Sequence, residues 1–142
     1  MKINVLKAKV KRNNLIKNAG KFYVNEASEL IQILNKQGKS ALLGIQNKKK
    51  GVYTIIGKQF VYYLTSSGTN GKIPLKQFTD ELHENGIRKG TGCLRFRLLY
   101  KNIVLSNGDK VWLYNSDTMF SIWNTVLWLQ ELPAANLGDS DL

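Results

Sequence analysis

The segment that most constrains the fold of this 142-residue chain is residues 52–64, VYTIIGKQFVYYL. Apolar, β-branched and aromatic residues flank a central Gly57-Lys58 pair, which suits a two-residue hairpin turn. This turn predicts two antiparallel strands in which Ile55 faces Phe60 and Tyr53 faces Tyr62. Because side chains alternate along a strand, these four residues would share one face of the sheet. The opposite face would carry Val52, Thr54, Ile56, Val61 and Tyr63.

Other segments predict further strands. Residues 3–12, INVLKAKVKR, alternate polar and apolar positions, which predicts a half-buried strand with Lys7, Lys9 and Lys11 on its outer side. Residues 15–24 predict a turn followed by a short strand, and residues 41–46 predict an apolar strand that ends in a loop at 47–51. Residues 93–105 read as one long strand, which a turn at 106–109 connects to residues 110–114.

Three segments predict helices. The first begins at Asn25, a favourable N-cap, and ends near Gly38. The second has Pro74 at its first position and ends at Gly86, with Leu75, Phe78 and Leu82 on its apolar side. The third begins at Ser116 or Asp117 and ends before Pro133.

These elements predict an α+β fold: a single domain with a mostly antiparallel sheet built from hairpins, about seven strands and about three helices. Hydrophobic residues make up 43% of the chain, enough for a substantial core. We assign residues 1–132 to this domain and residues 133–142 to an acidic, flexible C-terminal tail. Neither a signal peptide nor an apolar run of membrane-spanning length is present in the sequence, so we expect a cytoplasmic protein that does not bind membranes.

The charge of the chain is high and unevenly distributed. The formal net charge is +11, and the sequence pI is about 9.8. Residues 1–79 contain fifteen Lys or Arg and two acidic residues, whereas residues 80–142 contain six basic and eight acidic residues. A strongly basic body is typical of a surface that meets a polyanion. A lysine-rich surface that serves only solubility is the competing interpretation.

Sequence motifs give little support to an enzyme. The chain has one Cys and one His, which argues against a cysteine-based metal cluster or a Cys–His nucleophilic pair. The segment GTNGK at 68–72 lacks the spacing of a phosphate-binding P-loop. Asp80, His83 and Glu84 fall on one side of a predicted helix and could bind a metal or act in acid–base catalysis, but a solvated helix face opposite the apolar side explains them without any chemistry and is the favoured interpretation. We therefore expect a non-enzymatic protein with no cofactor and no metal.

Lysines and arginines next to aromatic residues favour nucleic-acid binding, because aromatic rings stack on bases while cations follow phosphates. We predict stacking by Tyr53, Phe60 and Tyr62, although Ile55 on the same face also fits a sheet face covered by a helix. The sequence does not separate DNA from RNA. The predicted phosphate contacts are Lys7, Lys9, Lys11, Lys48, Lys49, Lys50, Lys58, Arg88, Lys89, Arg95, Arg97 and Lys101.

The last predicted helix supports an alternative. Trp123 and Trp128 lie on different sides of it, so its apolar surface is wide enough to serve as a protein interface or to form a homodimer. The alternative function is a small phage- or mobile-element-type protein-binding module or inhibitor that docks on a protein partner. None of these motifs identifies a family.

Overall fold

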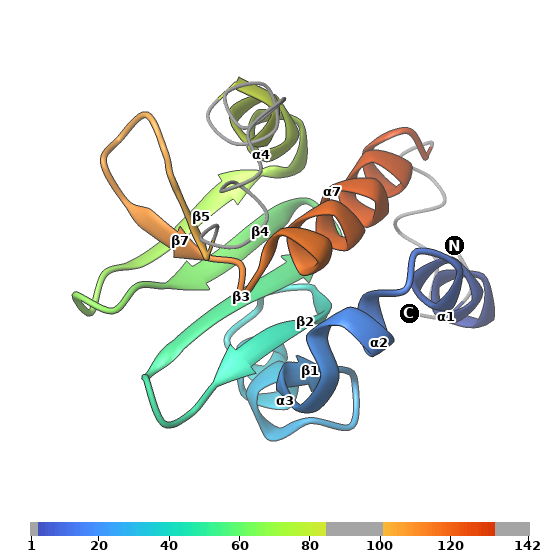
Figure 1. Cartoon of the computed structure of the whole chain (residues 1–142). Helices are drawn as coiled ribbons and strands as arrows, with labels where there is room; N and C mark the ends of the chain where they lie inside the picture. Colours follow the sequence, from blue (N-terminus) through green and yellow to red (C-terminus); the bar gives the residue numbers. More distant parts are fainter. Residues whose placement is uncertain (1–2, 85–100, 133–142) are drawn as a thin grey trace.

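The main sheet of the protein has five antiparallel strands in the order β1-β2-β3-β4-β5. The computed structural model describes residues 3–84 and 101–132. A separate two-stranded antiparallel sheet pairs β6 with β7 (Figure 1). This arrangement confirms the α+β class and the antiparallel hairpins. The strands are β1 Tyr23–Val24, β2 Ala41–Asn47, β3 Val52–Gly57, β4 Phe60–Leu64, β5 Asn70–Pro74, β6 Asn102–Val104 and β7 Lys110–Trp112.

The described residues contain five α-helices and one short 3₁₀ helix, η1, so the prediction of about three helices was too low. Helices α3, α4 and α7 correspond to the three predicted helices. Helices α1 and α2 lie in the N-terminal segment that was predicted to be a strand and a turn. The helices are α1 Ile3–Arg12, α2 Leu15–Ala19, η1 Gly20–Phe22, α3 Glu29–Lys36, α4 Leu75–Leu82 and α7 Ser116–Gln130.

The strand prediction for residues 3–12 was wrong, because the segment forms α1. Leu6 and Val10 are fully buried and lie four residues apart, which is one helical turn. A period of two also places apolar residues four apart, so the sequence pattern fits both structures, and the exposure of Ala8 separates them. A helix places Lys7 and Lys11 on a different side from Lys9, so the three lysines do not form one stripe.

The β3–β4 hairpin forms, but its register differs from the prediction by two residues. Ile55 pairs with Tyr62 and Tyr53 with Leu64, so the connecting residues are Lys58 and Gln59. Gly57 remains in the strand because the chain packs closely there. A Cβ atom on Gly57 would lie 2.8 Å from the Tyr62 ring and 2.9 Å from the Ser40 carbonyl oxygen. A shift of two residues preserves the faces, so the predicted division of side chains between them is correct.

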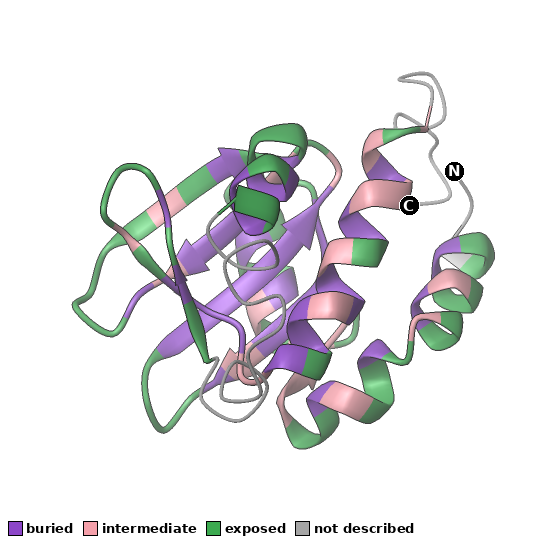
Figure 2. Cartoon of the chain, turned by 45° about the horizontal axis from the view of Figure 1, so that its top comes forward, coloured by how far each residue is buried: buried purple, intermediate pink, exposed green. Residues whose placement is uncertain are grey.

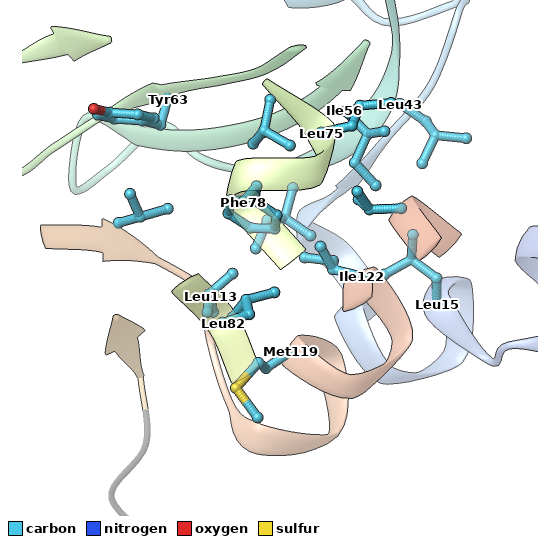
Figure 3. Packing of buried hydrophobic residues seen from close by; sticks show 14 of the residues in the cluster. Leu15, Leu43, Ile56, Tyr63, Leu75, Phe78, Leu82, Leu113, Met119 and Ile122 are labelled. Atoms are coloured by element: carbon cyan, nitrogen blue, oxygen red, sulfur yellow. The ribbon is translucent and has the colours of Figure 1, made fainter. Parts of the chain in front are cut away.

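One face of the main sheet packs against α4, α7 and α2 and forms the larger core. Figure 3 shows Phe78 and Leu82 of α4, Ile122 of α7 and Leu15 of α2 converging on this face. The buried apolar side of α4 is the one predicted from the sequence. The other face packs against α3, where Ile31 and Leu34 form a second, smaller cluster with the sheet. Figure 2 shows that the central strands are largely buried and that loops and the outer side of α1 are exposed.

The helix starts differ slightly from the predicted ones. Helix α3 begins after Ser28, while Asn25 forms a turn in which its Oδ1 accepts a hydrogen bond from the Ala27 amide. Pro74 occupies the N-cap position of α4. Asn115 caps α7 by accepting a 2.8 Å hydrogen bond from the Thr118 amide. Each shift is small because several capping residues lie next to one another in the sequence.

The β6–β7 hairpin has the predicted turn at 106–109 and is bonded to the main sheet. The Thr54 hydroxyl donates a 2.5 Å hydrogen bond to the carbonyl oxygen of Trp112. The Tyr63 hydroxyl donates a 2.6 Å hydrogen bond to Asp109 Oδ2. The predicted strand at 93–100 and the predicted tail at 133–142 lie outside the described residues. Within residues 3–84 and 101–132, no helix has both the length and the apolar character required to cross a membrane.

Candidate nucleic-acid interface

The loop between β2 and β3 presents three consecutive lysines, and it is a loop as predicted (Figure 1). Lys48, Lys49 and Lys50 are all exposed. Asn47, which is 9% exposed, accepts a 3.1 Å hydrogen bond from the Lys50 amide through its Oδ1. Gly51 ends the turn at φ 68°, a left-handed conformation that glycine adopts readily. A side-chain hydrogen bond and a left-handed glycine therefore define the loop backbone, which carries three exposed cationic side chains.

A pocket of about 520 Å³ lies beside this loop. Two stretches of the chain form it: residues 21–29, which run from η1 through β1 to the start of α3, and residues 46–49, at the end of β2 and in its loop. Three lysines and one glutamate contribute charge, so the lining is net positive. The lining residues are Lys21, Phe22, Val24, Ser28, Glu29, Gln46, Asn47, Lys48 and Lys49.

Phe22 supplies the aromatic ring of this pocket. The Lys21 ammonium lies 5.3 Å from the centre of the Phe22 ring. Phe22 also packs edge-to-face against Trp112 and Tyr114, with distances between ring centres of 5.4 Å and 4.8 Å. Tyr114 itself has a φ of 71°, which is uncommon for a bulky residue. The ring is half-buried and held by two aromatic neighbours.

Ion pairs leave most of the positive charge uncompensated. Among the lysines and arginines that the structure describes, only Lys7 and Lys76 pair with a carboxylate: Lys7 with Glu26 at 2.7 Å and Lys76 with Asp80 at 3.3 Å. The hydrogen bond from Lys7 is the main reason that the pKa of Glu26 falls below its usual value. In the part of the chain that the structure describes, the lysines of the pocket and of the β2–β3 loop are therefore available to bind an anion.

The other basic residues predicted from the sequence are spread over the molecule. Lys9 is half-buried and lines a groove between α1 and α7, whereas Lys11 is exposed. Lys58 is half-buried at the β3–β4 turn, and Lys101 is exposed before β6. The remaining predicted phosphate contacts lie outside the described residues; they are Arg88, Lys89, Arg95 and Arg97.

The predicted stacking residues lie on the sheet face that α3 covers. Tyr53 is 8% exposed and Tyr62 is 6% exposed, and both belong to the smaller core with Ile55. Burial raises the pKa of both phenols. Phe60 is half-buried, and the Lys72 ammonium lies 4.5 Å from the centre of its ring. A buried ring offers no face to a base, so only Phe60 of the predicted set remains a stacking candidate.

Phe22 and Lys21 were not among the predicted contacts. Their proximity in the sequence, a basic residue followed directly by an aromatic one, was a signal that could have identified them. Their juxtaposition with Lys48 and Lys49 depends on tertiary structure, since more than twenty residues separate the two segments.

The two tryptophans of α7 have different environments. Both are partly buried and pack against the larger core. The indole nitrogen of Trp123 is buried and makes no hydrogen bond in the described structure. Trp128 lines the groove of about 320 Å³ between α1 and α7, together with Val5, Lys9 and Arg12. Val5 is 51% exposed, so an apolar surface continues along the groove.

The acidic cluster of α4 separates into two environments. Asp80, His83 and Glu84 are exposed, as expected for a solvated helix face. Glu81 is 8% exposed, and its carboxylate accepts hydrogen bonds from the amide and the hydroxyl of Ser106. Glu81 therefore fixes the β6–β7 turn against α4. Within the described residues, no three His, Cys, Asp or Glu side chains form a group suited to a metal ion.

Comparisons with protein-family models, with curated proteins and with solved structures give no match for this chain.

Proposed function

We propose that this protein is a non-enzymatic nucleic-acid-binding protein that contacts the phosphate backbone through its lysine-rich surface. The observation that carries the proposal is the set of lysines gathered around the β2–β3 loop. Lys21 from η1 comes together with Lys48 and Lys49 around one pocket, with Lys50 on the same loop. None of these four forms an ion pair with a described carboxylate.

Physical chemistry favours phosphate as the partner of such a surface. A cluster of unpaired ammonium groups is electrostatically unfavourable in the free protein, and binding a polyanion relieves this repulsion while releasing condensed counterions. A surface that served only solubility would benefit from interspersed charges of both signs. Glu29 is the one carboxylate among the residues that line the pocket.

The proposal is tested by measuring the affinity of the purified chain for a fluorescently labelled oligonucleotide. The variant Lys48→Gln/Lys49→Gln/Lys50→Gln should keep its thermal stability, because these side chains are exposed, and should bind more weakly. The matched control is Lys17→Gln/Lys36→Gln/Lys110→Gln, which removes the same charge from exposed lysines elsewhere that form no ion pair with a described carboxylate. If the two variants lose affinity equally, the loop is not the contact surface. If the wild type does not bind, the function is wrong.

A second candidate function, docking on a protein, is favoured by the groove between α1 and α7. Trp128 and the exposed Val5 give this groove an apolar part, and Lys9 and Arg12 give it a positive rim. Interfaces of this composition use a tryptophan as an anchor. Under this hypothesis, Trp128→Ala would abolish co-purification of a partner, or dissociate a homodimer in light scattering, while the β2–β3 loop variant would not.

A further inference from the structure

We infer that the pocket beside the β2–β3 loop holds one unpaired nucleotide of a single strand, with its base on the Phe22 ring and its phosphate on the surrounding lysines. This inference rests on the proposed function and deepens it, because it names single-stranded nucleic acid as the substrate class. The pocket is about 520 Å³, within the range of about 300–1,000 Å³ that small-molecule pockets occupy.

The Phe22 ring is suited to stacking because its position is fixed. Trp112 and Tyr114 contact it edge-to-face, so binding a base would require little further ordering of the ring. Phe22 also lines the pocket, and its side chain is only half-buried. A base in a duplex is already stacked on both sides, whereas an unpaired base has a free face. An aromatic wall therefore selects single strands.

The polar groups around the ring are suited to a phosphate. Lys21, Lys48 and Lys49 line the same pocket as Phe22. Asn47 also lines it and is nine-tenths buried, and its Oδ1 is occupied by the Lys50 amide. Its amide nitrogen makes no hydrogen bond to any residue that the structure describes, so it has a donor free for a phosphate or sugar oxygen.

Glu29 is the reason that we expect the pocket to favour a nucleotide over an inorganic phosphate. Its carboxylate lines the pocket and repels phosphate near α3. A carboxylate also accepts hydrogen bonds from the amino groups of bases, as it does from cytosine N4. The combination of one aromatic ring, three cations and one carboxylate matches the parts of a nucleotide better than those of a simple anion.

The test compares a single strand of about 12 nucleotides with a duplex of the same sequence. Phe22→Leu removes the aromatic face and keeps an apolar side chain against Trp112 and Tyr114. The matched control is Phe120→Leu, since Phe120 is also a half-buried phenylalanine but lies on α7 and does not line the pocket. We expect Phe22→Leu to lower single-strand affinity by about 5- to 100-fold and to change duplex affinity by less than about twofold. Phe120→Leu should leave both affinities unchanged.

Further measurements separate stacking from a loss of structure. Phe22→Tyr keeps a ring of the same shape and should retain single-strand affinity even if Phe22→Leu lowers the thermal midpoint. Excess mononucleotide should displace the single strand, and the same concentration of inorganic phosphate should not. If inorganic phosphate displaced the single strand as well as the mononucleotide does, the pocket would be a simple anion site and the inference would be wrong.

The outcomes distinguish this inference from the proposed function. If the wild type binds duplex and single strand equally and Phe22→Leu binds both as well as the wild type, the nucleotide pocket is wrong, while the loss of affinity in the β2–β3 loop variant still supports nucleic-acid binding. If the wild type binds neither nucleic acid, both proposals are wrong.

Discussion

The hydroxyl of Tyr63 in β4 donates a 2.6 Å hydrogen bond to Asp109 Oδ2 in the β6–β7 turn. This bond joins the main sheet to the small one across forty-six residues of sequence. A hydrogen bond to a charged acceptor contributes about 1.5–3 kcal/mol. We therefore predict that Tyr63→Phe lowers the free energy of unfolding by about 1.5–3 kcal/mol, measured by urea denaturation. Tyr114→Phe is the control, since no hydrogen bond of its hydroxyl is found in the described structure, and it should change stability by less than about 0.5 kcal/mol. Equal effects of the two variants would contradict the role of the Tyr63 bond.

The raised pKa of Tyr23 leads us to predict a loss of stability at alkaline pH. Burial, and secondarily the nearby Glu26 carboxylate, raises the pKa of Tyr23 from 10.0 to about 12. The folded protein therefore holds this proton more tightly than the unfolded chain does. The stability that Tyr23 contributes is fully present below pH 10.0 and is lost as pH rises from 10.0 to about 12. Denaturation midpoints measured across this range should fall more steeply for the wild type than for Tyr23→Phe. Parallel curves would show that Tyr23 ionises at its ordinary pKa.

Gly44 of β2 lies where the neighbouring strand leaves no room for a side chain. A Cβ atom at this position of β2 would lie 2.2 Å from the Thr54 carbonyl oxygen and 2.8 Å from the Ile55 Cα, both in β3. Because neither backbone atom can move without breaking strand pairing, Gly44→Ala should destabilise the protein by about 1–3 kcal/mol or more. Gly68→Ala, in a loop with φ 89° and open space around its Cβ, should cost only about 1 kcal/mol. Thermal melts should show that Gly44→Ala is the less stable variant. A larger loss of stability in Gly68→Ala would contradict the crowding argument for Gly44.

Local sequence patterns predicted the faces of the sheet, but they did not predict which helices cover those faces. The faces of the β3–β4 hairpin follow from alternation alone, and a register error of two residues left them unchanged. The sequence could not decide whether the face with Tyr53 and Tyr62 is covered, because that depends on where α3 packs. Ile55, at 0% exposed, shows that a helix covers it.

In the N-terminal segment, the sequence pattern did not predict the secondary structure itself. Leu6 and Val10 satisfy both a two-residue and a four-residue spacing, so periodicity in ten residues does not separate a strand from a helix. The structure shows that the segment is a helix, α1, which packs beside α2 and α7 rather than in the sheet (Figure 1). In the candidate site, the exposed lysines of the β2–β3 loop were predictable from their lack of apolar neighbours. The pocket with Phe22 was not predictable, since it needs residues 21–29 and residues 46–49 brought together by the fold.

The salt dependence of nucleic-acid affinity tests whether the exposed lysines bind the phosphate backbone. Each phosphate bound by a lysine releases counterions, so the logarithm of the association constant should fall linearly with the logarithm of salt concentration, by about 0.7 per contact on a single strand. We predict a measurable affinity at about 50 mM salt. We also predict a slope for Lys48→Gln/Lys49→Gln/Lys50→Gln that is shallower than that of the wild type by about two units. An affinity that is absent at low salt, or one that does not change with salt in the wild type, would contradict these predictions.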